Sequence, residues 1–420
     1  MTTEIGPRVF YGWWILLAAV TVNIIGGGTA IYGLTLFIKP VVAEFNWSYL
    51  EVSSAIAITG VLVGVLSPII GGFVDRFGSR KVVLISSILV GTGFIILSFT
   101  SSIFVFYLAF AVMAAGVGGI GSIPLQAVIG NWFRRRMGFA MGITSTGVGL
   151  GGLILPVIAW LILTWDWRTA SLAVGIGICI IMPALAMVLR HRPEDYGYHP
   201  DGEKPSPLFQ TAEPAGKGEK RPADGITAGK ALRTNTFWLL AVAYSIYFMA
   251  LNAVILHIAP FLQSVELEPS TAALLATTLA IISNIGRIGY GYLGDRIPRR
   301  YAFAITFLSQ SLGLVVVLFA PSAWALGLFI FLYGTGYGGS VALSSAMTRE
   351  YFGRTSFGAI QGWFFASTTF AGMVGPMFAG WIFDINQSYN VAWMVFAVAN
   401  ACGIASVLAL KRVPAADGAS

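Results

Sequence analysis

Charged residues are scarce in this sequence, at 10% of its 420 residues. Soluble domains carry about a quarter of their residues as Asp, Glu, Lys or Arg, so the composition excludes an ordinary soluble domain. Hydrophobic residues supply 56% of the chain and gather in long uninterrupted runs. A run of about 18 residues or more crosses roughly 30 Å of hydrocarbon as an α-helix, which satisfies its own backbone in lipid. The sequence therefore predicts an all-α membrane protein in a lipid bilayer.

Residues and motifs that carry chemistry are also scarce. The two cysteines, Cys179 and Cys402, lie in apolar runs without the spacing of metal ligands, so we expect neither a disulfide nor a metal site. No stretch has the G-x-x-x-x-G-K-[ST] form that binds nucleotide phosphates, and no nucleophile–base pair is evident. We therefore expect neither an enzyme nor a cofactor. The first apolar run lacks a small-residue cleavage site, which predicts that it is retained as a transmembrane helix.

Twelve apolar segments are predicted to span the membrane. They run over 11–38, 50–74, 81–100, 103–132, 138–164, 169–189, 236–261, 270–294, 300–320, 323–348, 357–384 and 390–411. The polar residues between the sixth and seventh segments are rich in Pro, Gly, Lys and Glu, which is typical of a flexible linker. The predicted organisation is an N-terminal six-helix bundle (1–189), a cytoplasmic linker (190–234), a C-terminal six-helix bundle (235–412) and a short cytoplasmic tail (413–420).

The distribution of Lys and Arg predicts the orientation. If the N-terminus is cytoplasmic, all basic residues but three fall on the cytoplasmic side; the exceptions are Lys39, Arg168 and Arg287. Membrane proteins concentrate basic residues on that side. The net charge of +7 is thus explained by topology and gives no support to a nucleic-acid partner. We expect a multi-pass protein with both termini in the cytoplasm.

An internal repeat relates the two sets of six segments at a constant offset of 220 residues. The stretch GGFVDRFGSR at 71–80 matches GYLGDRIPRR at 291–300, and GVGG at 116–119 matches GYGG at 336–339. The same offset pairs Pro40 with Pro260, Gly142 with Gly362 and Pro156 with Pro376. Two bundles related in this way form a pseudo-symmetric pair, and folds of this kind bind substrate near mid-membrane between the bundles.

The motif G-x-x-x-D-R-x-G-x-R-K at 71–81, with its degenerate copy at 291–300, resembles the signature of major facilitator superfamily transporters. The resemblance covers essentially the whole chain and implies the twelve-helix major facilitator fold and secondary transport by alternating access. It also implies that charged motif residues latch the two halves together: Asp75, Arg76, Arg80, Asp295, Arg296 and Arg300. Each aspartate can accept hydrogen bonds from a helix N-terminus, whose dipole favours an anion. The alternative is that these residues only fix the loops.

Two further stretches resemble the monocarboxylate transporter family. WFRRRMGFAMGITSTG at 132–147 matches its pattern of aromatic-Phe, basic residues and A-x-G-x-x-x-x-G, and YGWW at 11–14 resembles its opening Gly-Trp motif. In those transporters an arginine of the eighth span binds the substrate carboxylate, and Arg287 lies in the eighth span here. The related oxalate–formate antiporters carry their essential cation in the eleventh span, where 357–384 has none. The resemblance implies a prokaryotic member, in the cytoplasmic (cell inner) membrane.

The chain departs from the animal members of that family at two positions. Ser283 stands one helical turn before the arginine, where those proteins have an aspartate, and Gly33 stands where they have a lysine. Both groups belong to proton coupling in the family. Coupling here is therefore either absent or dependent on another residue.

Arg287 is predicted to lie near the middle of the membrane. Nine residues separate it from Arg296 at the cytoplasmic surface, which corresponds to about 13 Å along a helix. A charge at that depth costs at least about 2.5–3.5 kcal/mol, and no span holds a mid-membrane Asp or Glu to neutralise it. The equivalent position of the first half is Ser67, so the architecture does not require arginine. We expect the guanidinium to bind a substrate carboxylate; the alternative is a structural arginine bound to backbone carbonyls.

Four other residues are candidates for the substrate site. Asn284 lies three residues before Arg287, and Tyr333 and Tyr337 can offer phenols to a carboxylate. His257, the only histidine in a span, is a candidate for substrate and proton alike, since its unperturbed pKa of about 6.5 suits a proton carrier. The alternative for each is ordinary packing or helix–helix hydrogen bonding. The same alternative applies to further polar residues within spans: Asn23, Tyr32, Gln126, Ser145, Asn252 and Gln361.

The predicted function is secondary active transport of a small organic anion, a monocarboxylate carried in symport with a proton by a monomeric protein. Within transport, a carboxylate anion exchanger and an exporter of an amphipathic acid remain as alternatives. A membrane transceptor, which senses a solute without moving it, is the alternative from another class. It would be expected to add a soluble signalling segment, and neither the linker nor the tail resembles one.

Overall fold

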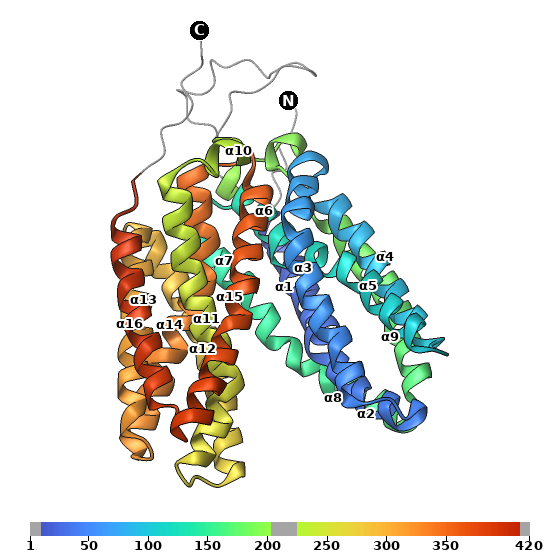
Figure 1. Cartoon of the computed structure of the whole chain (residues 1–420). Coiled ribbons are helices and arrows are strands. Elements are labelled where there is room, and N and C mark those ends of the chain that lie inside the picture. Colours follow the sequence, from blue (N-terminus) through green and yellow to red (C-terminus); the bar gives the residue numbers. More distant parts are fainter. Residues whose placement is uncertain (1–9, 203–224, 412–420) are drawn as a thin grey trace.

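The computed structural model describes residues 10–202 and 225–411. Helices form nearly all of this part of the chain, and no sheet occurs in it, which confirms the all-α prediction. The helices gather into two bundles that stand side by side (Figure 1). The first nine residues, residues 203–224 of the predicted linker and the predicted tail lie outside the described residues.

The first bundle contains six long helical segments, three of them interrupted. Its elements are α1 (Gly12–Gly26), η1 (Gly27–Gly33), α2 (Leu34–Phe45), α3 (Tyr49–Phe77), α4 (Ser79–Ser98), α5 (Ile103–Ile120), α6 (Ser122–Trp132), α7 (Met137–Leu150), η2 (Gly151–Ile154), α8 (Leu155–Thr164) and α9 (Trp167–Val188). The interruptions are a π-helical segment at η1, a break at Gly121 and a 3-10 turn at η2. Glycines fall at each of them, where helix backbones approach closely; a Cβ at Gly28 would lie 2.6 Å from the Gly151 carbonyl.

The second bundle repeats this arrangement with fewer breaks. Its elements are α11 (Asn235–Ser264), α12 (Pro269–Arg296), α13 (Arg299–Val316), η6 (Val317–Phe319), α14 (Ala323–Phe352), α15 (Phe357–Asn386) and α16 (Asn390–Leu408). Three short elements lie within the predicted linker: η3 (Pro193–Tyr196), η4 (Pro200–Gly202) and α10 (Ala228–Ala231). We call the end of the molecule with the loops at 78, 133–136, 297–298 and 353–356 the linker end, and the opposite end the far end.

Eleven of the long segments have the length and composition needed to cross a membrane. The twelfth, α15, is 30 residues long but does not meet the same criterion of composition. It packs between the bundles against α3 and within its own bundle against α11, where the Phe237 and Phe364 rings stack at 4.6 Å. The twelve predicted spans are thus all present as helices in the described residues.

Two predicted ends differ from the structure by more than three residues. The first segment continues past Pro40 to Phe45, and α14 continues to Phe352 instead of ending at 348. Proline is tolerated in a transmembrane helix because neighbouring helices can satisfy the backbone group that it frees. Sequence alone does not reveal this compensation.

The bundles have separate apolar cores and meet closely from the linker end to about the level of Arg287. Phe357 of the second bundle joins Ile70, Val74 and Ile123 of the first in a small cluster of buried residues. Glycines bring the backbones together there: Gly71 of α3 abuts Gly358 of α15, and Gly138 of α7 abuts Gly291 of α12. Away from the linker end the bundles spread apart (Figure 1).

Candidate functional site

A cavity of about 420 Å³ lies between the two bundles. Ile31 of η1 and Ile255 of α11 lie at its wall and are 52% and 55% exposed, so the cavity opens toward the far end. Most of the wall is apolar, and no residue of it in the described chain is acidic. Its polar side chains include Asn23, Tyr32, Ser145, Asn252, Arg287 and Tyr337.

Toward the linker end the cavity is closed by buried polar side chains of both bundles. Ser345 of α14 contacts Gln126 of α6, and its hydroxyl accepts a 3.2 Å hydrogen bond from the amide of Gln361. All three are less than a tenth exposed, and the Oε1 atom of Gln361 has no hydrogen-bond partner among the described residues. We call this contact of Gln126, Ser345 and Gln361 the polar gate.

Arg287 lies at the cavity wall and is only 5% exposed. Its Nη1 atom donates to the Ser145 carbonyl of α7 at 2.7 Å and to Oδ1 of Asn284 at 3.3 Å. Its Nη2 atom donates to the Tyr337 hydroxyl at 3.3 Å, and Nε has no partner among the described residues. All these partners are neutral acceptors. The alternative of a structural arginine bound to backbone carbonyls therefore explains the hydrogen bond to Ser145, but no carboxylate among these partners neutralises the guanidinium.

The pseudo-symmetric position shows what the helix contact itself requires. The backbone carbonyl of Arg287 packs on Gly142 of α7, and that of Ser67 packs on Gly362 of α15 in the same way. Ser67 completes its contact with a 2.9 Å hydrogen bond from its hydroxyl to the Gly362 carbonyl. Since a serine suffices there, the guanidinium of Arg287 is an addition to the helix contact, and it lies at the cavity wall.

The structure brings together three of the five predicted substrate residues. Arg287, Asn284 and Tyr337 are linked by hydrogen bonds, and Arg287 and Tyr337 line the cavity. Tyr333 does not reach it: its ring is fully buried, stacks on Phe329 at 5.5 Å and packs against Gly313 of α13. Tyr333 is therefore a packing residue of the second bundle, which was the alternative to a role at the substrate site.

His257 lies in the second bundle, outside the residues that line the cavity. Its Nε2 atom is 3.0 Å from the Pro376 carbonyl, and its Nδ1 atom is 3.1 Å from the Tyr389 hydroxyl. Since a carbonyl only accepts, Nε2 carries the proton and Nδ1 accepts from Tyr389 in the neutral ring. Protonation at Nδ1 would require the hydroxyl to turn and accept, which a hydroxyl can do.

Gly149 of α7 makes room for the Arg287–Asn284 pair. A Cβ at this position would lie 3.0 Å from Nη1 of Arg287 and 2.9 Å from Oδ1 of Asn284. We predict that Gly149→Ala folds normally, because flexible side-chain ends can move aside, but displaces the guanidinium and raises the KM for substrate several-fold. Gly152→Ala is the matched control, since a Cβ there meets nothing within 4 Å. Equal KM values for the two variants would contradict this position of the guanidinium.

The motif aspartates make contacts between the bundles at the linker end. Asp75 of α3 accepts hydrogen bonds from the backbone N–H groups of Gly358 at 2.7 Å and Ala359 at 2.8 Å, in the first turn of α15. Asp295 of α12 accepts from Gly138 at 2.7 Å and Phe139 at 2.9 Å, in the first turn of α7. The expected pairing of each aspartate with a helix N-terminus is therefore present, twice and symmetrically.

The motif arginines behave differently from the aspartates. Arg76, Arg80 and Arg296 are exposed, and Arg296 stacks on Tyr292 of its own helix. Arg300 stacks on its neighbour Tyr301. No contact of these four side chains with the opposite bundle is recorded among the described residues, so their latch role stays a prediction.

Two arginines that were not predicted as latch residues make contacts at the linker end. Arg299 donates to Asp295 at 3.3 Å, and Arg349 of α14 donates across the interface to the Gly130 carbonyl at 3.0 Å and to Asn131 at 2.6 Å. A pattern signal for Arg349 exists: it follows Ser345 by four residues on α14, about one helical turn, and so lies on nearly the same face.

The chain is similar in sequence to known membrane transporters. A family model described as "Major Facilitator Superfamily" matches residues 16–268 and 240–420. Monocarboxylate transporter 13 of Bos taurus is 25% identical over 393 residues, covering 93% of this chain and 87% of that protein. The oxalate:formate antiporter of Oxalobacter formigenes is 26% identical over 420 residues, covering 98% and 93%.

Solved structures share the fold at low sequence identity. The crystal structure of the fucose:proton symporter of E. coli superposes with a TM-score of 0.70 at 13% identity, covering 96% of this chain and all of that one. The human organic anion transporter MFSD10 gives a TM-score of 0.64 at 14% identity, covering 95% and 97%.

Proposed function

The chain belongs to the Major Facilitator Superfamily, and on this premise we propose that it carries small monocarboxylates across the membrane by alternating access. It is a multi-pass membrane protein related to monocarboxylate transporters and to an oxalate:formate antiporter, and these relatives are transporters, not enzymes. Its substrate and its transport mechanism are what we propose here.

The observation that carries the proposal is Arg287 at the wall of the cavity between the bundles. Its guanidinium has neutral acceptors on both Nη atoms and no acidic residue beside it in the described cavity wall. A substrate carboxylate would supply the missing negative charge and accept two parallel N–H bonds from the planar fork. Tyr337 and Asn284 would hold the fork in place, and the apolar remainder of the wall suits a short hydrocarbon chain.

The conformation supports alternating access. The cavity is open at the far end and closed at the linker end by the polar gate and by the two aspartate contacts. We propose that these contacts break when the bundles, residues 1–189 and 235–412, rock about the site to open the linker end. Release of a carboxylate would then follow on that side.

We propose that the linker end is cytoplasmic, as the basic loops at that end support, in a prokaryotic cytoplasmic membrane. The chain would work as a monomer, because each bundle contributes one wall of the cavity. Neither a nucleic-acid partner nor a cofactor enters the mechanism.

Proton symport is the coupling that we propose, with His257 as the carrier. His257→Gln should leave exchange of labelled for unlabelled substrate near its normal rate, because the Arg287 site is untouched. Uptake driven by an inward proton gradient should fall to the level without a gradient. The measurement is proteoliposome uptake over a series of imposed gradients. An unchanged dependence on the gradient would remove His257 from the coupling mechanism.

Exchange and export remain alternative modes, and the same preparation distinguishes them. Uptake that requires preloaded anion, at any gradient, would indicate an exchanger, and efflux without uptake would indicate an exporter. Binding without any movement of solute would indicate a transceptor. Proton-driven uptake into empty vesicles is the result that supports symport.

A further inference from the structure

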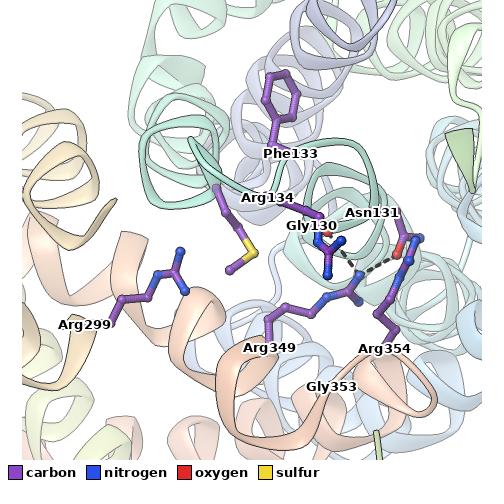
Figure 2. Close-up of a pocket in the computed structure, with 9 residues that line it drawn as sticks. Gly130, Asn131, Phe133, Arg134, Arg299, Arg349, Gly353 and Arg354 are labelled. Carbon is purple, nitrogen blue, oxygen red and sulfur yellow. Dashed lines mark hydrogen bonds between the residues drawn. The ribbon is translucent and has the colours of Figure 1, made fainter. Parts of the chain in front are cut away.

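A second pocket, of about 210 Å³, lies at the linker end between the two bundles. Four arginines line it, one from the first bundle and three from the second: Arg134, Arg299, Arg349 and Arg354 (Figure 2). No acidic residue lines it within the part of the chain that the structure describes. Guanidinium groups of both bundles therefore line this pocket at the junction of the bundles.

The carboxylates near this pocket approach its arginines from the flanks. Glu194 pairs with Arg354 at 3.0 Å, and Glu350 and Asp295 pair with Arg299 at 3.1 and 3.3 Å. His191, next to these groups, adds no charge at neutral pH, because burial lowers its pKa to about 4. The flanking pairs orient the guanidinium groups but leave the space between the bundles lined by donors.

The pocket is built on an ordered scaffold. Arg349 is 8% exposed and is held by the Gly130 carbonyl and by Asn131, as Figure 2 shows. The Nε atom of Arg299 is buried without a hydrogen-bond partner among the described residues. Arg134 is exposed on the loop before α7, and its backbone N–H donates to Asp201 at 3.0 Å. Arginine side chains of both bundles thus line one volume.

This pocket is separate from the substrate cavity. Tyr337 in the cavity and Arg349 in the pocket are twelve residues apart on α14, which is about 18 Å along the helix. The gate of Gln126, Ser345 and Gln361 lies between them.

We propose that this pocket is a second anion site, which binds an oxyanion group, phosphate or carboxylate, between the bundles at the linker end. Guanidinium groups recognise the paired oxygens of such anions. The anion would contact arginines of both bundles, so it would bind the arrangement in which the linker end is closed. Free anions and the phosphate of an anionic lipid share this chemistry, and the test distinguishes them.

The test is thermal unfolding of the full chain in phosphatidylcholine nanodiscs, with potassium phosphate compared with potassium chloride at equal ionic strength. Phosphate at many times its Kd should raise the unfolding midpoint by about 2–4 °C. Arg134→Gln, which removes an exposed donor, should reduce that shift, and Arg134→Gln with Arg299→Gln should abolish it. A second series in nanodiscs containing phosphatidylglycerol, without added phosphate, tests the lipid head group as the source.

Two controls separate this proposal from the proposed function. Arg287→Gln removes the cavity guanidinium and should keep the full phosphate shift. Arg136→Gln, on the same loop as Arg134 but outside the pocket, should also keep it. An arginine-dependent shift with phosphatidylglycerol alone would assign the same site to a lipid head group. No shift from either source, or a shift of equal size in the Arg134→Gln variants, would overturn the proposal.

Discussion

Arg287→Ala is expected to reduce carboxylate uptake to the level of empty vesicles while the protein still folds. The guanidinium is the one cation in the described wall of the cavity, and the change removes it together with its bonds to Ser145 and Tyr337. Arg287→Lys should lose most of the uptake as well. An ammonium keeps the charge but lacks the planar fork, and the loss of one charge-assisted hydrogen bond corresponds to about 10–100-fold.

Ser67→Ala is the matched control for this prediction. Ser67 occupies the equivalent position of the first bundle, and its hydroxyl bonds to Gly362 outside the described cavity wall. Its uptake should stay within about twofold of the unmodified protein, because one ordinary hydrogen bond is worth only about 0.5–1.5 kcal/mol and lies away from substrate. Circular dichroism and size-exclusion profiles would verify folding for all variants. Normal uptake by Arg287→Ala would contradict the proposal that Arg287 binds the substrate carboxylate.

Asp75→Ala is expected to shift the protein strongly toward the conformation that is open at the linker end. The change removes two hydrogen bonds from a carboxylate to the first turn of α15 and leaves those N–H groups without their acceptor. Hydrogen bonds to charged groups contribute about 1.5–3 kcal/mol each, so the closed state should lose at least about tenfold in relative population. The measurement is the labelling rate of a Ser345→Cys reporter by a hydrophilic thiol reagent, with Cys179 and Cys402 replaced by alanine.

Asp166→Ala is the control that separates a latch from a helix cap. Asp166 also accepts from a helix N-terminus, at Thr169, but it does so within the first bundle and at the far end. Its loss should lower thermal stability slightly and leave the labelling rate of the reporter unchanged. If both aspartate variants label at the same rate, the Asp75 contact fixes a loop and does not hold the bundles together.

The sequence predicted those features that hydrophobic length and charge determine. The helices follow from apolar runs, and the position of Arg287 within α12, nine residues before Arg296, follows from the length of one such run. The 220-residue repeat predicted the equivalence of Asp75 and Asp295, which make matching contacts. Each of these depends on spacing along one helix or on a repeat, which a sequence displays directly.

Features that depend on how helices turn toward one another were not predictable in this way. Tyr333 and Tyr337 are one turn apart, yet only Tyr337 reaches the cavity, because Gly313 lets α13 pack against Tyr333. Arg349 was assigned to the inner surface by its position near a helix end, but the approach of α6 buries it. Both outcomes depend on packing between segments far apart in the chain.

The most direct test of the central claim compares acids with their amides as substrates. Proteoliposomes would be offered lactate, pyruvate, acetate and an aromatic acid beside the matching amides, with and without an inward proton gradient. The amides have nearly the same shape but lack the negative charge that Arg287 is proposed to bind. The account predicts uptake of at least one acid, stimulated by the gradient, and none of its amide. Equal uptake of an acid and its amide, or no uptake of any acid, would contradict it.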